Sequence, residues 1–271
     1  MRPHLLPLLC LPLGCPVALA DEQRYDLSGG AEYYTLKEFG GNGARLVRED
    51  GLLPGVRLHW QERGERIIFR LDGGLAGGVI HYDGQTQNGA PHTTDGYHLL
   101  PEVGVGAEWP SQRRLRAYGR MEFAADYRYL NNKGAVAGAT EFYQRLSLGL
   151  GLTADIWQNG RRSLTLWGGR LEPMKSTVDV YSHTGADDMS LTLETGTGWE
   201  AGAAYVWKSA QQRQWLLQAT CRDLRLDPSA PVPVMVNGVA NGTAVYQPEI
   251  HFHRCGLTLG VRLPLAASPA N

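Results

Sequence analysis

Four titratable residues lie at or beside the ends of a polar segment, 84–95, and could carry out acid–base chemistry. They are His81, Asp83, Asp95 and His98. A carboxylate beside an imidazole orients the ring and supports it as a general base that activates water. The pattern therefore raises the hypothesis of a hydrolytic site. Polar loops of exported proteins are rich in these residue types, so a solvated rim without catalysis is the preferred interpretation.

A second pair of imidazoles could hold a metal ion. His251 and His253 flank Phe252, which places both rings on one face of an extended strand. Zinc in proteins usually takes three or four protein ligands, and no third ligand is evident beside these two. We therefore expect neither a metal nor any other cofactor.

The stretch 145–153 shows which kind of element positions these residues. Leu146, Leu148, Leu150 and Leu152 alternate with small or polar residues. A period of two is typical of a β-strand, because successive side chains point to opposite faces. One face is purely apolar and the other carries glycine, serine, threonine and arginine, which is typical of a strand between lipid and a polar barrel interior.

Short turns and long polar segments alternate along the chain and divide it into ten strands. The short turns lie at 62–65, 110–113, 158–161 and 209–212, and Asn159-Gly160 is a strong hairpin signal. The long segments are 39–53, 84–95, 131–139, 173–188 and 227–244. The predicted strands are 29–38, 54–62, 66–83, 96–109, 113–130, 140–156, 162–172, 189–207, 213–226 and 245–265. An even strand count with short turns at one end and long loops at the other is the pattern of a bacterial membrane barrel.

The alternation also assigns side chains to the two faces of the wall. A charge facing lipid near the midplane costs about 2–4 kcal/mol, so charged residues are expected inside. The predicted charge network of the lumen comprises Arg57, Arg70, Asp72, Glu102, Glu108, Arg116, Arg120, Glu122, Arg145, Glu200 and Arg262, with Asp126, Arg128, Arg222 and Arg254 on the same face. Five tryptophans beside the short turns are predicted to form an interfacial aromatic girdle: Trp60, Trp109, Trp157, Trp207 and Trp215.

The first twenty residues read as a cleaved secretory signal peptide. Arg2 precedes an apolar run, Leu5 to Leu13, and Ala18-Leu19-Ala20 is a small-x-small cleavage site. The mature barrel domain would then be 21–271. Of the four cysteines only Cys221 and Cys255 remain in it, on strands joined as a hairpin, and an oxidising compartment allows a disulfide between them.

With these features the chain resembles a ten-stranded bacterial outer-membrane β-barrel over residues 29–265. The resemblance implies a single all-β domain in the outer membrane of a Gram-negative cell, with short periplasmic turns and long extracellular loops. It also implies insertion by the barrel-insertion machinery, contact with outer-membrane lipid and lipopolysaccharide, and a monomeric state. The chain departs from the usual pattern at its end, where Leu265 closes the last strand instead of an aromatic residue.

Three functions remain open from the sequence. We expect a non-enzymatic barrel with a narrow, charge-lined lumen, which serves a structural or surface role or a porin-like passage of small solutes. Omptin-like surface proteases are ten-stranded barrels with paired Asp and His residues at the rim, so Asp83, His98, His81 and Asp95 make a rim hydrolase the first alternative. A secreted β-propeller that binds ligands is the second. The formal charge of −1 gives no basic surface for nucleic acid.

Overall fold

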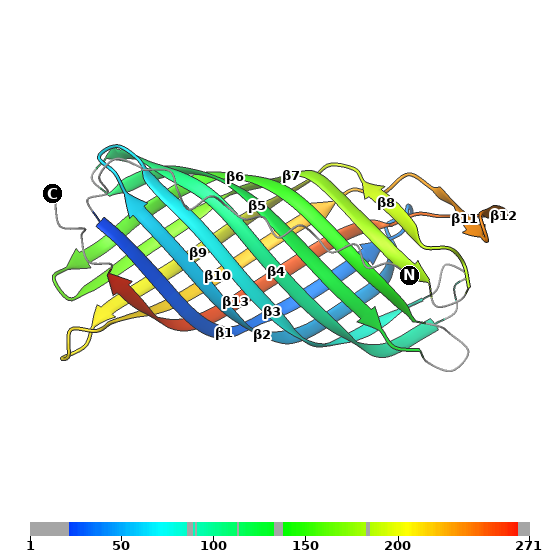
Figure 1. Ribbon diagram of the computed structural model, residues 1–271, viewed down its shortest axis with the longest axis horizontal. Coiled ribbons are helices and arrows are strands. Elements are labelled where there is room, and N and C mark those ends of the chain that lie inside the picture. The colour runs from blue at the N-terminus through cyan, green and yellow to red at the C-terminus, as the bar shows by residue number, and fades with distance from the viewer. Residues whose placement is uncertain are drawn as a thin grey trace.

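The computed structural model describes residues 22–264, apart from 86–88, 90, 113, 133–137 and 183–184, as a closed antiparallel β-barrel (Figure 1). Ten strands form the wall: β1 (Glu22–Phe39), β2 (Arg45–Arg63), β3 (Ile68–Gln85), β4 (Pro91–Gln112), β5 (Leu115–Leu130), β6 (Ala139–Asn159), β7 (Arg162–Ser182), β9 (Gly196–Lys208), β10 (Gln214–Leu226) and β13 (Glu249–Pro264). The described part contains no helix long and apolar enough to span a membrane. The predicted signal peptide lies outside the described residues.

Each wall strand pairs with its neighbours in the chain, and β1 pairs with β13 to close the ring. β1 begins and β13 ends beside the short turns, at the end that we call the turn end (Figure 1). The connections at the opposite end, the loop end, are 40–44, 86–90, 131–138, 183–195 and 227–248. This topology confirms the predicted ten-stranded antiparallel barrel, and it excludes a propeller, whose blades are separate sheets.

Several strands extend farther toward the loop end than the sequence predicted. The predicted loop 39–53 is mostly strand, because β2 begins at Arg45, and β7 continues through the predicted loop 173–188 to Ser182. In 45–53 the inward positions Val47 and Leu53 are buried, so the alternation persists there. Outward-facing charges such as Arg48 obscure this alternation in the sequence, because a stretch of low hydropathy resembles a loop.

The predicted strand 189–207 is interrupted. β8 (Met189–Leu193) and β9 both pair with β7, and the pairs Ser176↔Leu193 and Leu171↔Gly198 lie in one register. The break at 194–195 faces a stretch of β7 that contains Pro173, which has no backbone N–H to donate to a neighbouring strand. The wall therefore continues past the break in the same register.

The last long connection contains a small hairpin that projects from the loop end (Figure 1). It consists of β11 (Val232–Val236) and β12 (Val239–Val245), joined by Asn237 and Gly238 in positive-φ conformations. Two positive-φ residues between strands make the tight turn that favours Asn-Gly. The carboxylate of Asp187, on the preceding connection, accepts hydrogen bonds from the backbone N–H groups of Asn237 (3.1 Å) and Gly238 (2.7 Å).

The two faces of the wall differ as the alternation requires. Large apolar side chains point outward and remain exposed, among them Leu27, Leu58, Val105, Leu150, Leu257 and Leu259. Inside, glycines let large side chains lie flat on the wall: a Cβ on Gly202 would lie 2.1 Å from the Trp167 ring. The barrel thus has an apolar exterior and an interior into which large side chains project.

Candidate functional site: the charged lumen

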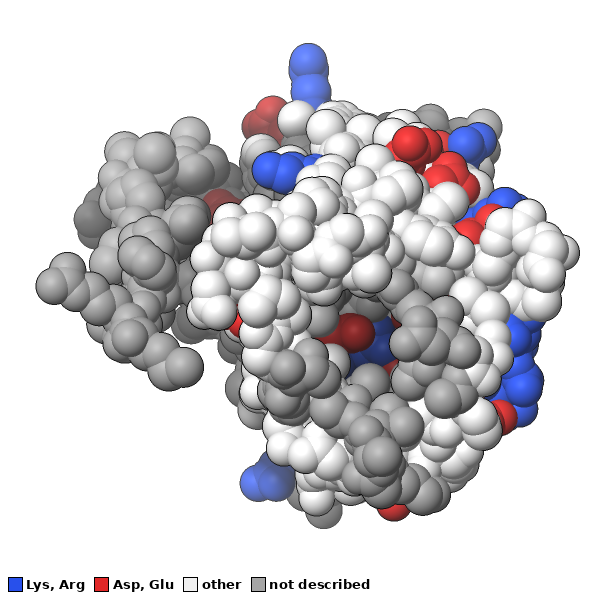
Figure 2. Space-filling view, turned by 90° about the vertical axis from the view of Figure 1, so that its right-hand side faces the viewer, with Lys and Arg blue, Asp and Glu red and all other residues white. Residues whose placement is uncertain are grey.

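The lumen divides into two parts along the barrel axis. The part toward the turn end contains a polar cavity of about 310 Å³. The part toward the loop end is packed with apolar side chains, including Leu36, Ile80, Val178, Leu224 and Ile250, which are at most 2% exposed. From the loop end, the space-filling view shows a central hollow with acidic and basic side chains visible inside it (Figure 2).

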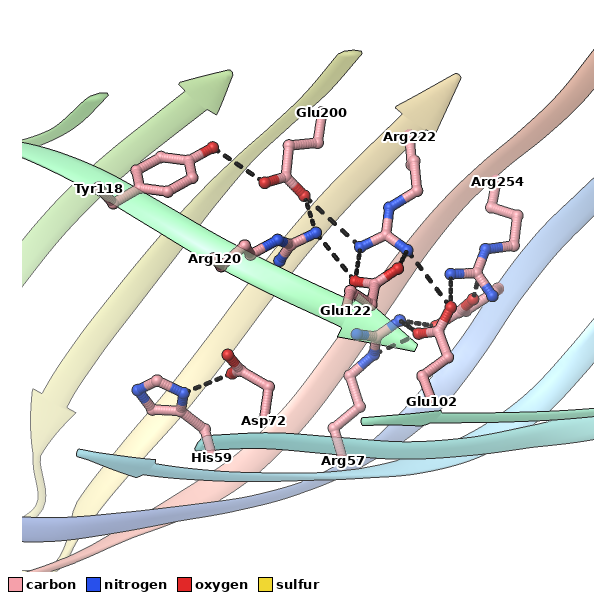
Figure 3. A network of polar contacts seen from close by, with 11 residues as sticks. Arg57, His59, Asp72, Glu102, Tyr118, Arg120, Glu122, Glu200, Arg222 and Arg254 are labelled. Atoms are coloured by element: carbon pink, nitrogen blue, oxygen red, sulfur yellow. Dashed lines mark hydrogen bonds and ion pairs between the residues drawn. The ribbon is translucent and has the colours of Figure 1, made fainter. Parts of the chain in front are cut away.

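Arg222 is the centre of a charge network between these two parts (Figure 3). Its guanidinium donates two hydrogen bonds to Glu122, at 2.7 and 2.8 Å, and one of 3.3 Å to Glu102. The nitrogen that donates the 2.8 Å hydrogen bond, Nη2, also lies 3.5 Å from Glu200. One arginine from β10 therefore connects carboxylates from β4, β5 and β9 across the lumen. It can do so because the planar guanidinium group carries several N–H donors.

Neighbouring side chains extend this network around the ring (Figure 3). Arg120 pairs with Glu122 (3.0 Å) and with Glu200, whose other oxygen accepts a hydrogen bond from the Tyr118 hydroxyl (2.9 Å). On the opposite side Arg57 and Arg254 both pair with Glu32 and with Glu102. The mixture of signs lets each buried charge find a partner, which limits the desolvation penalty.

The cavity walls nearer the turn end carry separate ion pairs. Arg262 binds Asp26 through two contacts of 2.7 and 2.8 Å, and His59 Nδ1 lies 2.6 Å from Asp72. Glu108 pairs with Arg70 and with Arg116 (2.8 Å), and Arg116 also contacts Asp155 (3.0 Å). The cavity is therefore lined by charges of both signs that are already paired.

Arg145 differs from the other predicted lumen residues. Its guanidinium lies over the ring of Phe252, 5.6 Å from the ring centre. Such a cation–π contact stabilises a desolvated cation by about 2 kcal/mol. Arg145 thus lies at the boundary between the charge network and the apolar packing.

A buried polar cluster lies within the packed part of the lumen, around His98. Its ring nitrogens lie 3.2 Å from Glu49 and 3.3 Å from Asp126, and Tyr34 donates a hydrogen bond to Asp126 (3.1 Å). Arg128 pairs with Glu49, and the His98, Glu49 and Arg128 side chains are at most 1% exposed. The ring is fully buried between two carboxylates, so it is not placed to act on a substrate at the surface.

The four rim candidates do not form one site. His81 lies 3.2 Å from Asp95 on the outer surface, where both side chains are more than half exposed. Asp83 faces outward too and lies 3.6 Å from Arg45. His98 faces the interior, so the wall of the barrel separates it from the other three.

The outer face of the last hairpin holds a disulfide between Cys221 and Cys255, which are directly paired residues of β10 and β13. His251 and His253 share this face, and each lies beside a carboxylate, Glu249 at 2.6 Å and Asp223 at 3.5 Å. Among the described residues there is no group of three His, Cys, Asp or Glu side chains that could hold a metal.

The tryptophans near the turns face outward. Trp207 and Trp215 stack with ring centres 6.4 Å apart, and Trp109 and Trp157 are 46% and 40% exposed. Trp60 pairs with the outward-facing Tyr25 and Leu71.

Sequence reasoning missed several partners of the network. Asp26 precedes the predicted first strand and Glu49 falls in a predicted loop, so neither was assigned a face. Glu32 lies within the predicted strand, and alternation with the apolar residues beside it was the signal that could have placed it inside.

Comparison with known proteins supports the barrel at the level of fold. No family model matches the chain, and no curated protein matches it in sequence. Among solved structures, the outer membrane protease OmpT from Escherichia coli is similar with 10% identity, 91% of this chain and 97% of that chain covered, and a TM-score of 0.56. The translocator domain of the autotransporter NalP from Neisseria meningitidis has 12% identity, 88% of each chain covered and a TM-score of 0.42. Ail of Yersinia pestis has 12% identity, 89% and 99% covered, and a TM-score of 0.32.

The fold and the charged lumen define a class: this chain is a ten-stranded β-barrel of the bacterial outer-membrane type. At 10% sequence identity, the similarity to OmpT shows a shared fold and nothing about activity. What the barrel does must therefore be argued from its own residues.

Proposed function

We propose that the chain is an integral outer-membrane protein, exported by its signal peptide. The support is a band of exposed apolar side chains around the wall, between charged turns such as Glu65 and Lys208 and the outward-facing charges Asp50, Asp223 and His253. Lipid-facing bands of membrane barrels are about 25 Å tall and flanked by aromatic girdles. We assign Trp60, Trp109, Trp157, Trp207 and Trp215, which face outward near the turns, to the girdle on the turn side.

We propose lipopolysaccharide and the barrel-insertion machinery as its partners. Across four adjacent strands the outward-facing residues Arg48, Lys37, His251 and Arg225 are directly paired in register. They form a row on the loop side of the apolar band, the level at which anionic lipid headgroups lie. Each lysine or arginine near such a surface is attracted by about 1 kcal/mol.

Within the membrane, we propose a non-conducting barrel with a structural or surface-presenting role. The observation that carries this function is the packed lumen toward the loop end, where Leu36, Ile80 and Leu224 are at most 2% exposed beside the buried His98 cluster. An ion that crossed this layer would have to displace both apolar packing and paired charges. The projecting hairpin and the loops are then the surfaces available for binding other molecules.

Planar-bilayer recording tests this function. The wild-type barrel is expected to give no stable conductance steps. The double variant Leu36→Ala with Leu224→Ala removes packing from the blocking layer and should conduct, whereas Leu150→Ala with Leu259→Ala on the outer face should not. Heat-modifiable gel mobility would verify that each variant folds. Steady conductance through the wild-type protein would contradict the proposal.

A second candidate function is reversible uptake of small polar solutes into the cavity at the turn end. The cavity of about 310 Å³ favours it, because paired charges of both signs suit a small zwitterion. Calorimetric titration with arginine and with glutamate should then give saturable heats that are lost in Arg222→Met and retained in Arg45→Met. Absence of saturable binding for both amino acids would leave the cavity a purely structural space.

A further inference from the structure

Four side chains on the outer face of β10 and β13 form a constellation that the barrel function does not use. They are Cys221, Asp223, His253 and Cys255, and the register pairs Cys221 with Cys255 and Asp223 with His253. The disulfide joins the first pair, and His253 Nδ1 lies 3.5 Å from Asp223 Oδ2. The other ring nitrogen, Nε2, lies 3.5 Å from Cys255 Sγ.

This order of groups, carboxylate, imidazole and sulfur, is that of an activated thiol site. The carboxylate contacts Nδ1 and positions the ring so that its other nitrogen points toward the sulfur. Here the sulfur belongs to a disulfide. A proton donor next to one sulfur of a disulfide makes that sulfur the better leaving group in thiol–disulfide exchange, because exchange is faster when the leaving thiolate is stabilised.

We propose that Cys221–Cys255 is a reactive disulfide that exchanges with external thiols, with His253 as the catalytic proton donor and Asp223 as its positioning residue. An incoming thiolate attacks Cys221 Sγ and forms a mixed disulfide. The bond to Cys255 breaks, and its electron pair leaves on Cys255 Sγ, which takes the proton from His253 Nε2. A second thiolate attacks the mixed disulfide at the incoming sulfur, forms the external disulfide and releases Cys221 as a thiolate that water protonates.

The position of the constellation makes it accessible to such a reagent. Leu257 and Leu259 on β13 point into the apolar band, whereas His253 and Asp223 lie on its loop side with side chains 44% exposed. The other charged and titratable side chains near it on this face are Tyr33 and Lys37 on β1, Arg225 on β10, and Glu249 and His251 on β13 itself. None of these is placed between His253 and the disulfide.

His251 provides a matched control for His253. It lies two residues away on the same face, but its ring contacts Glu249 at 2.6 Å and packs at a tilt against Phe39, with ring centres 4.7 Å apart. The oxidised full chain in mild detergent would be treated with excess dithiothreitol, and samples would be quenched with a maleimide-coupled polymer that shifts gel mobility. His253→Gln is expected to slow cleavage by tenfold or more, a conservative loss for removal of a proton-transfer group. His251→Gln should cleave at the wild-type rate.

A second readout separates a chemical role from a structural one. In the reduced wild-type barrel, Cys255 should react with iodoacetamide at a rate different from that of Cys221, and His253→Gln should abolish the difference. Asp223→Asn should slow dithiothreitol cleavage, and Asp223→Glu should restore it. Equal cleavage rates for wild type and His253→Gln, equal slowing by His251→Gln, or no cleavage of the folded protein at all would each overturn the proposal. Heat-modifiable mobility of the oxidised variants would show that the barrel is intact.

Discussion

At the scale of single residues, the interior is organised by a few arginines that each serve several carboxylates. Arg222 contacts Glu102, Glu122 and Glu200, so its loss would take one partner from each of three buried acids and leave their charge less fully compensated. A buried pair contributes little net stability compared with apolar packing, but breaking it is costly because the remaining charge is uncompensated. The network therefore contributes more to specifying which strands face one another than to the total free energy of folding.

Replacement of Arg222 tests this view. Arg222→Met should lower the free energy of unfolding by about 3–5 kcal/mol, because it removes one side of a buried ion network. Arg45→Met is the control, since Arg45 and Asp83 form an exposed pair at 3.6 Å and such pairs contribute at most about 1 kcal/mol. Urea titration of both variants in the same detergent provides the comparison, and equal losses would contradict a central role for Arg222.

Glu38 gives the interior a pH dependence at the loop end. It accepts a hydrogen bond from Gln247 (2.8 Å), and the adjacent Lys37 faces outward, which places this level beyond the apolar band. Burial raises the pKa of the Glu38 carboxyl to about 8. Because the folded-state pKa lies above the unfolded value, the folded protein disfavours ionisation, and stability falls as the pH rises from about 4.5 to about 8.

Glu38→Gln should remove this part of the pH dependence. The variant is expected to gain stability relative to wild type between pH 5 and pH 8, with a slope of up to about 1.4 kcal/mol per pH unit, and to run parallel to it above pH 9. Urea midpoints at four pH values would measure the difference. A constant offset between the two proteins across this range would refute the assignment to Glu38.

At the scale of elements, the sequence predicts the strands well where lipid imposes a strict alternation and less well beyond it. Leu146 to Leu152 on β6 show the pattern because every outward residue there must be apolar. On β2, the stretch 45–53 lies where water can solvate outward charges, so the rule no longer applies and the strand reads as a loop. That is why Glu49, and with it the contact to His98, could not be predicted. The contact also depends on the register of three strands, which a single sequence does not specify.

The hydrogen bonds between Asp187 and the hairpin of β11 and β12 should stabilise the hairpin without affecting the stability of the barrel. Asp187→Ala removes two acceptors from the N–H groups of Asn237 and Gly238, and exposed hydrogen bonds of this kind contribute about 0.5–1.5 kcal/mol each. We expect faster proteolytic cleavage within 232–245 and an unchanged heat-modifiable barrel. Asp188→Ala serves as the neighbouring control. Protection of the hairpin in Asp187→Ala would show that the strand pairing alone holds it.

At the scale of the whole molecule, the apolar outer band requires a membrane or detergent around the barrel. The exposed side chains of Leu27, Leu58 and Leu150, each about half accessible, would face water in a soluble protein and favour aggregation. The protein should therefore sediment with membranes, resist extraction by salt and alkali, and require detergent for solution. Recovery in the aqueous fraction of broken cells without detergent would contradict the membrane assignment.

The pairing of β1 with β13 has a consequence for the covalent order of the chain. Arg24 lies opposite Pro264, and ion pairs Arg262–Asp26 and Arg254–Glu32 bridge this seam much as other ion pairs bridge the remaining ones. The barrel therefore does not depend on the chain termini lying between β1 and β13. A permuted chain with a short linker between Pro264 and Arg24, opened at Asn159-Gly160, should refold in detergent to the same heat-modifiable cylinder, with its new ends still at the turn end.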